Sequence, residues 1–254
     1  RLSKHVPLEY RKTLSAAEET ASARRAQWGE EVERVEEARR FDRVTLLPLL
    51  LKALSLALAE HPLFLCTLPP PSTSCSSSDD APTLTRRSSH DLSIALSSPS
   101  PSGGLFTPVL RSVESSSVFS LASQISYLQS FLSSSSSGAP KFPPEHQGAG
   151  SITLSNVGVV GGRTTHPVIP PTGQLAIGAI GRVRVEPRFV EEEEARRVAG
   201  GREEDGGREW KVEPRLVLDA SFTADHRVVE GVELARLVET WKRIVEEPSR
   251  LLAA

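Results

Sequence analysis

The 254-residue sequence predicts an α/β domain in which a β-sheet and helices form separate layers. Two observations support this prediction. Several short stretches alternate apolar and polar residues, which is the two-residue period of a half-buried strand. Several longer stretches repeat apolar residues every three or four positions, which is the period of a helix that buries one face. No internal repeat is evident, so these elements are expected to share one domain over residues 1–254.

The most apolar stretch, residues 46–59, is predicted to be a helix inside the core. Its leucines occupy more than one side, so other elements should pack on it from several directions. Thr45 can cap its start, Pro48 is tolerated in a first turn, and His61 marks its end. The run is shorter than the ~20 residues that a membrane-spanning helix needs. We therefore expect a buried helix and no membrane segment.

Three further stretches are predicted to be helices. Residues 12–40 are rich in Ala, Glu and Arg, which are strong helix formers, and their charges indicate a solvated face. Apolar residues recur at three and four positions over 118–132, although serines on the polar face weaken the intrinsic helicity. The last helix is predicted over 234–245, where Pro248 stops the run.

Strand patterns lie between these helices. Residues 92–96 and 105–110 alternate, and the Ser-, Pro- and Gly-rich turn between them could join them as a hairpin. Residues 151–155 are a short strand that runs into a glycine-rich segment. The stretches 175–185 and 216–222 each predict one further strand. Strands that interleave with helices in this way are typical of a layered α/β domain.

Three segments interrupt the pattern and are predicted to be loop-like insertions. Residues 69–89 begin with three consecutive prolines followed by a Ser/Thr-rich stretch, and residues 133–148 contain five consecutive serines and the pair Pro143-Pro144. Residues 191–207 are charged and contain glycines. Such compositions bury too little apolar surface to offset the entropy of ordering the chain. We interpret all three as insertions within one domain.

Composition excludes several classes of function. The formal net charge is −2, from 30 basic and 32 acidic residues, so there is no global basic surface for nucleic acid. Cys66 and Cys75 are too few for a disulfide framework and do not match a zinc-binding spacing, so no metal is expected. Their number favours a reducing compartment. The chain contains no methionine and starts at Arg1, so we expect a fragment of a longer product.

The stretch Asp225-His226-Arg227-Val228-Val229-Glu230-Gly231 is the main candidate site. It places a histidine between ionisable neighbours, directly after a strand pattern and before a helix pattern. Catalytic groups are common where a rigid element gives way to a turn. Spacing alone favours a solvent-facing turn histidine, since none of the six histidines forms a metal-ligand pair.

This stretch resembles the Asp-His-Arg-x-x-Asp-Gly signature of the acyltransferase core of 2-oxoacid dehydrogenase complexes. Glu230 replaces the usual aspartate. Other segments are similar to the family in the same order. They are the entry strand at 5–8, the leucine-rich helix and Glu-His-Pro ending within 44–62, and the segments at 103–110, 148–162 and 170–178. Chance agreement at so many ordered places is implausible, so the chain is identified as a member of this family.

The resemblance implies a fold and a reaction. The family fold is similar to chloramphenicol acetyltransferase, a mixed β-sheet flanked by helices, and it assembles as trimers that build larger cores. The family reaction moves an acyl group between a lipoyl dihydrothiol and the thiol of coenzyme A. Coenzyme A and the lipoyl group would therefore be substrates, and no tightly bound cofactor is implied.

The resemblance also implies roles for individual residues. His226 aligns with the family's catalytic base, which removes the thiol proton. Ser155 aligns with a serine that donates a hydrogen bond to the oxyanion from a neighbouring subunit. Without the resemblance, Ser155 would be interpreted as a strand-end hydroxyl satisfied locally. Glu230 takes the place of a carboxylate that an arginine pairs with, and Gly231 is expected to allow a tight entry to the last helix. Asp225 and Arg227 complete the signature as supporting residues.

Three departures from the family pattern bear on activity. Glu230 is one methylene longer than aspartate, the helix that carries the pairing arginine would lie before Arg1, and the loop-like insertions replace compact segments. These departures favour a core-forming structural paralogue, similar to the family's protein X. It would help to recruit dihydrolipoamide dehydrogenase to a complex that we take to be the pyruvate one. The alternative is an active dihydrolipoamide acyltransferase with His226 as base and Ser155 as oxyanion donor.

Family membership further implies where and with what the chain works. We expect a homotrimer within the acyltransferase core of a complex. Upstream lipoyl and subunit-binding domains, absent from this sequence, would provide the contact with dihydrolipoamide dehydrogenase. The mitochondrial matrix is the expected location if the source is eukaryotic. No nucleic-acid or membrane partner is expected.

Overall fold

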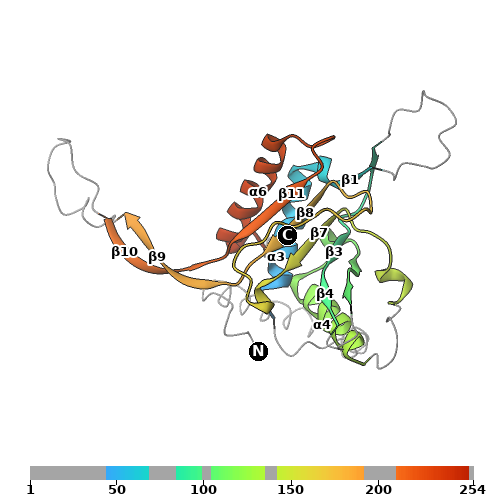
Figure 1. Ribbon diagram of the computed structural model, residues 1–254, viewed down its shortest axis with the longest axis horizontal. Helices are drawn as coiled ribbons and strands as arrows, with labels where there is room; N and C mark the ends of the chain where they lie inside the picture. Colours follow the sequence, from blue (N-terminus) through green and yellow to red (C-terminus); the bar gives the residue numbers. More distant parts are fainter. Residues whose placement is uncertain (1–43, 69–83, 99–103, 135–141, 192–209, 252–254) are drawn as a thin grey trace, which may run out of the picture.

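A computed structural model describes residues 44–68, 84–98, 104–134, 142–191 and 210–251 (Figure 1). The entry strand at 5–8 and the helix predicted over 12–40 lie outside the described residues, as do most of the three predicted insertions and Cys75. Among the described residues, the elements form a body with a mixed sheet and helices. A two-stranded ribbon projects from that body (Figure 1).

The body is built on a five-stranded mixed sheet with the order β11-β8-β7-β3-β6. The three inner strands, β8, β7 and β3, run parallel to one another, and the outer strands β11 and β6 run antiparallel to their neighbours. The sheet strands are β3 (Leu92–Ile94), β6 (Val109–Leu110), β7 (Ile152–Asn156), β8 (Ala176–Ile180) and β11 (Ala220–Ala224). The predicted mixed sheet flanked by helices is confirmed.

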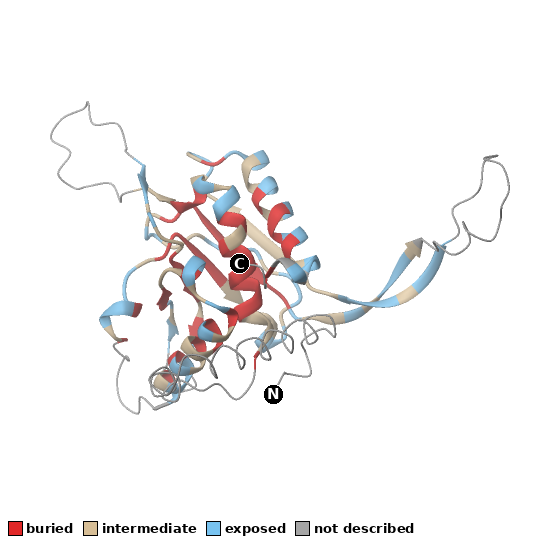
Figure 2. Cartoon of the chain, turned by 180° about the vertical axis from the view of Figure 1, so that it is seen from behind, coloured by how far each residue is buried: buried red, intermediate tan, exposed pale blue. Residues whose placement is uncertain are grey.

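The core helix α3 spans Leu46–Glu60, where the apolar run predicted it. Ten of its 15 residues are buried, and it contacts both α4 and α6 (Figure 2). The helix includes one buried charge, Lys52, whose Nζ donates to the backbone oxygen of Glu114 at 2.9 Å. A buried ammonium needs such an acceptor, since desolvation lowers the pKa of Lys52. Thr45 occupies the N-cap position, but its side chain makes no capping hydrogen bond.

The other two helices are amphipathic, as their periodicity predicts. Helix α4 spans Val118–Ser134 and buries the apolar residues that recur every three or four positions. Helix α6 spans Gly231–Glu246 and buries Leu237, Trp241 and Ile244. The Trp241 indole N–H donates to the backbone oxygen of Leu50 at 3.1 Å, and its ring packs edge-on against Phe222. These contacts bind α6 to both α3 and the sheet.

The structure contains short strands and turns in places where the sequence predicts loops or a hairpin. The stretch 105–110 divides into two strands, because β5 pairs with β4 while β6 pairs with β3. The end of the predicted insertion 69–89 includes strand β2, which pairs with β1. The end of the insertion 133–148 includes a 3₁₀ turn fixed to the body by His146, which is buried and bonds the backbone oxygen of Val109. The remaining short elements are η1 (Pro62–Leu65), β1 (Cys66–Thr67), β2 (Thr85–Arg86), β4 (Leu96–Ser97), β5 (Leu105–Phe106), η2 (Val113–Ser115), η3 (Pro144–His146), η4 (Gly158–Val160) and η5 (Pro248–Leu251).

The projecting ribbon, which we call the arm, consists of β9 (Arg184–Glu191) and β10 (Trp210–Val217). The two strands pair antiparallel over eight residues each. The sequence predicts single strands over 175–185 and 216–222, and both predictions are wrong in extent. In each case the chain leaves the central sheet and continues in the arm, with breaks at 181–183 and 218–219. The alternation of apolar and polar residues continues across both breaks. It therefore does not reveal that the chain changes from one strand partner to another.

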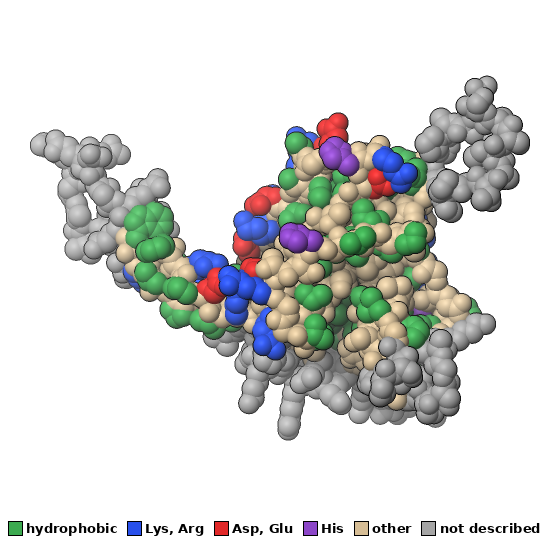
Figure 3. Space-filling view, viewed as in Figure 1, with side chains coloured by type: hydrophobic (Ala, Val, Ile, Leu, Met, Phe, Trp, Pro, Cys, Tyr) green, Lys and Arg blue, Asp and Glu red, His purple; other side chains and the backbone are tan. Residues whose placement is uncertain are grey.

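The two faces of the arm differ in polarity. Side chains alternate between the faces of a strand pair. Seven of the eight residues that the register places on one face are apolar: Val185, Pro187, Phe189, Trp210, Val212, Pro214 and Leu216. Most residues of the opposite face are charged: Arg184, Glu186, Arg188, Lys211, Glu213 and Arg215. Phe189 is 74% exposed and Val185 is 65% exposed, so this apolar face has no cover within the described chain (Figures 2 and 3).

Candidate active site

The signature stretch forms a tight turn between β11 and α6. The backbone oxygen of Asp225 accepts hydrogen bonds from the N–H groups of Val228 and Val229. The N–H of Asp225 itself donates to the backbone oxygen of Leu175 at 2.8 Å, which holds the start of the turn against β8. His226 is exposed on this turn. An exposed imidazole on a fixed turn can accept a proton from a group that approaches from outside the chain.

Asp225 and Arg227 form an ion pair that fixes the same turn. Arg227 donates from Nε and Nη2 to the Asp225 carboxylate, with the shortest contact at 2.6 Å, and its backbone N–H donates to Oδ1 at 3.1 Å. The Arg227 hydrogen bond lowers the pKa of Asp225 below its ordinary value. Both supporting residues therefore act on the conformation of the turn that presents His226.

Glu230 and Gly231 lie where the turn enters α6. Glu230 is exposed at the N-cap position and its side chain makes no capping hydrogen bond. The helix expected to carry the pairing arginine would lie before Arg1, outside this sequence. Gly231 is the first residue of α6, and a Cβ built there meets open space. Packing within the described chain therefore does not require glycine at this position.

Ser155 lies near the C-terminal end of β7 and is half-buried. Alternation along β7 places it on the same face as Thr153, opposite to the core residue Leu154. Asn156 follows, and its side-chain oxygen accepts a hydrogen bond from the N–H of Gly158 at 3.0 Å. The serine therefore precedes a turn whose backbone is internally bonded, which restricts where its hydroxyl can lie.

Strand register places Ser155 and His226 at opposite ends of the sheet. Ser155 lies beside Ala179, which lies beside Ser221, whereas Ala224 lies three rows further along β11. Ser155 and Ala224 are offset by three residues along the strands and by two strand-to-strand distances across the sheet, so their backbones lie about 14 Å apart. His226 lies beyond Ala224. One copy of the chain therefore cannot bring both side chains to one carbonyl group.

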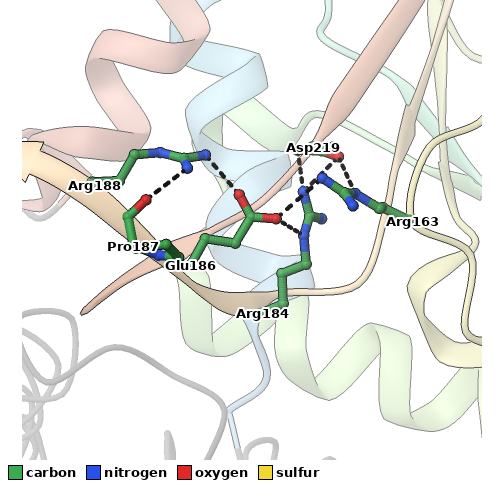
Figure 4. Close-up of polar contacts among 6 residues, drawn as sticks. All are labelled: Arg163, Arg184, Glu186, Pro187, Arg188 and Asp219. Atoms are coloured by element: carbon green, nitrogen blue, oxygen red, sulfur yellow. Dashed lines mark hydrogen bonds and ion pairs between the residues drawn. The ribbon is translucent and has the colours of Figure 1, made fainter. Parts of the chain in front are cut away.

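The segment after Ser155, residues 157–163, which we call the site loop, packs on the base of the arm. A cluster of five charged residues joins the two: Arg163, Arg184, Glu186, Arg188 and Asp219 (Figure 4). Local sequence patterns do not predict this arm-base cluster, because its members are separated by up to 56 positions. The alternation of apolar residues with Arg and Glu in 184–191 and 210–217 is the one local signal that could have indicated it.

Two kinds of feature are absent among the described residues. None of their helices is long and apolar enough to cross a bilayer. They also contain no group of three or more His, Cys, Asp or Glu side chains arranged to hold a metal ion.

Two residues at the ends of the sheet have side chains suited to acyl transfer. His226 has an imidazole that can act as a base, and Ser155 has a hydroxyl that can stabilise an oxyanion. The chain belongs to the family of 2-oxoacid dehydrogenases acyltransferase (catalytic domain), which it matches over residues 13–253. The family assignment made from the sequence motifs is thus confirmed.

Curated relatives come from animals, plants and bacteria. The lipoamide acyltransferase component of branched-chain alpha-keto acid dehydrogenase complex from Caenorhabditis elegans is 30% identical over 211 residues, 83% of this chain. The corresponding mouse protein is 30% identical over 210 residues. A chloroplastic dihydrolipoyllysine-residue acetyltransferase component of the pyruvate dehydrogenase complex from Arabidopsis thaliana is 29% identical over 208 residues. The chain spans 39% of the worm protein and 36% of the mouse protein.

Solved structures agree with this assignment. The cubic core of the pyruvate dehydrogenase multienzyme complex superposes with a TM-score of 0.60 at 28% identity, covering 82% of this chain and 71% of that one. Azotobacter vinelandii dihydrolipoamide acetyltransferase gives the same TM-score at 27% identity and covers the same share of each chain. The body described above therefore has the fold of these acyltransferase cores.

Proposed function

We propose that this chain is the catalytic domain of an active dihydrolipoamide acyltransferase in a 2-oxoacid dehydrogenase complex. This reverses the order of the two interpretations drawn from the sequence. The relatives named above are acyltransferase components, and none of them is named as a structural paralogue. The observation that carries the proposal is the presence of both His226, exposed on a fixed turn, and Ser155, at the start of a bonded loop.

The proposed reaction uses each group once. His226 removes the proton from the thiol of coenzyme A, and the thiolate sulfur attacks the carbonyl carbon of the acyl-lipoyl thioester. The carbonyl oxygen becomes an oxyanion, to which the Ser155 hydroxyl donates a hydrogen bond. Collapse of the intermediate breaks the bond to the lipoyl sulfur, which leaves with the proton that His226 held. Acyl-CoA and the dihydrolipoyl group are the products.

Glu230 is compatible with this activity. The structure of the Azotobacter vinelandii enzyme was determined to study the catalytic roles of a serine, a histidine and an asparagine four positions after that histidine. Aligning the histidines places Glu230 at the position of that asparagine. A protein named as an acetyltransferase therefore does without aspartate at this position. Glu230 in place of aspartate is then no argument against activity.

The proposed active unit is a homotrimer with its site between subunits. Ser155 and His226 lie at opposite ends of one sheet, so a neighbouring copy must supply one of them. The arm supports this proposal, because its apolar face is uncovered within the described chain. Pro187 and Pro214 lie opposite each other in the arm and lack N–H groups, which disfavours pairing along the arm's edges. We therefore propose that the arm packs by its apolar face on a second copy.

The wider context follows from the relatives and is part of the proposal. The chain would belong to the core of a multienzyme complex, as the cubic-core structure does. Domains outside this sequence would carry the lipoyl group and contact dihydrolipoamide dehydrogenase. The worm and mouse relatives are named as mitochondrial and the Arabidopsis one as chloroplastic, so an organelle matrix or stroma is the proposed location in a eukaryote.

Acyl transfer by the purified domain tests the proposal. We expect transfer from acyl-CoA to free dihydrolipoamide, and we expect His226→Ala to reduce kcat by about 100- to 10,000-fold. His166→Ala is the matched control, because His166 is also exposed but lies outside the signature turn, and it should retain activity. A folded trimer that shows no transfer would refute the proposal and favour the structural paralogue.

The same assay can identify which acyl group the enzyme prefers. The sequence analysis assigned the pyruvate complex, which transfers acetyl groups, whereas the relatives at 30% identity belong to branched-chain complexes. We propose a branched-chain acyl group on the strength of these relatives. The ratio of kcat/KM for isobutyryl-CoA to that for acetyl-CoA should exceed one, and a ratio below one would assign the acetyl group instead.

A further inference from the structure

The site loop is held against the base of the arm by backbone hydrogen bonds. The N–H of Val157 donates to the oxygen of Ile180 at 3.0 Å, and the N–H of Arg182 donates to the oxygen of Gly162 at 2.8 Å. The segment that accepts the loop is itself held, because the N–H of Gly181 donates to the backbone oxygen of Asp219 at 2.9 Å. The loop after Ser155, the start of β9 and the end of β10 therefore form one bonded unit.

Two glycines permit this close approach. A Cβ on Gly181 would lie 1.8 Å from the backbone oxygen of Arg163, and a Cβ on Gly158 would lie 2.6 Å from the backbone oxygen of Gly181. Both distances are too short for any side chain, and both involve backbone atoms that cannot move aside alone. The loop and the arm base are therefore in direct backbone contact, so a displacement of one is transmitted to the other.

The arm-base cluster adds a second set of bonds across the same contact (Figure 4). Arg184 Nη2 donates to both carboxylate oxygens of Asp219, at 3.0 and 2.8 Å, while its Nε donates to Glu186. Arg163, from the site loop, donates to Glu186 at 3.2 Å and lies 3.7 Å from the Asp219 carboxylate. Asp219 thus binds one arginine from the arm and one from the loop, and Glu186 binds two from the arm and one from the loop.

The geometry of these bonds makes the cluster more specific than an ordinary surface pair. The side chains of Arg184, Glu186 and Asp219 are 21%, 18% and 27% exposed, whereas Arg163 is 68% exposed, so the pairs lie at the surface with their acceptors partly covered. The hydrogen bond with Arg184 lowers the pKa of Glu186, and that with Glu186 raises the pKa of Arg184, so both stay charged at neutral pH. Networks of this kind fix a geometry even where each pair contributes little stability.

We propose that Asp219 and Arg184 are positioning residues that hold the site loop, and with it the Ser155 hydroxyl, in place relative to the arm. The inference rests on the proposed acyl transfer and on the proposed contact of the arm with a second copy. In that assembly, docking of the arm fixes the arm base, and the cluster passes this constraint to the loop that follows the oxyanion donor. Neither residue touches substrate, so they act through Ser155.

Steady-state kinetics of Asp219→Asn test the positioning role. The substitution keeps the shape of the side chain and removes its charge. We expect kcat to fall by about tenfold with KM for acyl-CoA unchanged. A misplaced oxyanion donor reduces the stabilisation of the transition state but not the binding of the substrate. Arg215→Gln is the matched control, since Arg215 pairs with Glu213 on its own strand, and its kcat should stay at the wild-type value. The assembly mass should be the same for all three proteins.

The double variant distinguishes positioning from a general structural effect. If Asp219 acts through the Ser155 hydroxyl, adding Asp219→Asn to Ser155→Ala should cause no further loss of kcat. Losses that multiply in the double variant would overturn the inference, as would an unchanged kcat or a reduced assembly mass in Asp219→Asn.

Hydrogen exchange gives a readout that does not depend on activity. We expect the amides of Val157, Gly162 and Arg182 to exchange roughly tenfold faster in Asp219→Asn than in wild type, whereas α3 amides should not change. Unchanged exchange at these three amides would overturn the inference even if the wild type is active. If the wild type transfers no acyl group, the proposed function fails, and this exchange experiment alone decides whether the cluster holds the loop.

Discussion

Strand β8 and the apolar face of the arm are both formed by non-polar residues but lie in opposite environments. All five residues of β8 are buried, between β7 and β11 on its edges and helices on one face. In the arm, the apolar residues Phe189 and Val212 are 74% and 58% exposed, although they lie beside each other as a β pair. Burial of apolar surface is the main favourable term in folding, so β8 is stabilised by its own chain and the arm's apolar face is not.

This difference indicates which parts of the chain depend on another copy. A continuous exposed apolar face on a soluble protein marks a contact surface. The arm also carries the cluster that holds the site loop, so the region without its own cover is connected to Ser155. The body should therefore fold alone, whereas the candidate active site should require assembly.

Charging the apolar face of the arm should have the largest effect. Phe189→Asp combined with Val212→Asp would place two carboxylates in the proposed contact, where unpaired charges are costly. We expect a monomer by sedimentation and a loss of acyl transfer of at least about 100-fold, because the oxyanion donor is then missing. The far-UV circular dichroism of the body should be retained. Arg215→Gln, on the opposite face, should leave the assembly intact, and a trimer in the doubly charged variant would contradict the comparison.

Truncating one apolar side chain in each region should separate their stabilities. Leu54 in α3 is fully buried, so Leu54→Ala should lower the free energy of unfolding by about 2–5 kcal/mol at any protein concentration. Phe189→Ala should change the unfolding of the dilute chain by no more than about 0.5 kcal/mol. Urea denaturation followed at low and high protein concentration measures both values. Equal losses for the two variants would show that the arm is stabilised within its own chain.

A smaller effect is expected from removing the partner of the buried carboxylate Asp91. Burial alone would raise the pKa of Asp91, but hydrogen bonds from Arg111, the Ser112 N–H and Ser89 outweigh it and leave that pKa lowered. Stabilisation from such a group is present above the unfolded pKa of about 3.9 and is lost as pH falls through the folded value. Arg111→Gln should raise the folded pKa, so acid unfolding should begin at a higher pH than in wild type.

Acid titration by circular dichroism from neutral pH downward checks this expectation. Arg243→Gln is the control, because Arg243 forms an exposed pair with Glu60 at 3.4 Å and should leave the acid transition unchanged. An identical transition in Arg111→Gln and wild type would contradict the role given to the Asp91 pair.

Local signals in the sequence were sufficient for the helices and for most of the core. Helix α3 begins after Thr45 and ends before His61, as predicted, although the Thr45 side chain makes no capping hydrogen bond. The face of α6 that contains Leu237 and Trp241 is also where its periodicity placed it. The turn that carries His226 was predicted from the change from a strand period to a helix period.

The arm and the arm-base cluster could not be predicted in this way. The alternation over 216–222 continues through a break at which the chain passes from the arm to the sheet. That break includes Asp219, whose partner Arg184 lies 35 positions away in the sequence. The separation of Ser155 from His226 likewise depends on strand order, because β8 lies between their strands, and local periodicity does not determine strand order.

Mixing two inactive variants tests the central claim that the active site requires two copies. Ser155→Ala retains His226, and His226→Ala retains Ser155, so each homotrimer should be nearly inactive. Unfolding the two together in equal amounts and refolding them should give mixed trimers in which about one quarter of the interfaces pair an intact serine with an intact histidine. We expect activity to recover to about that fraction of the wild-type value. Mixed trimers that stay as inactive as their parents would contradict it.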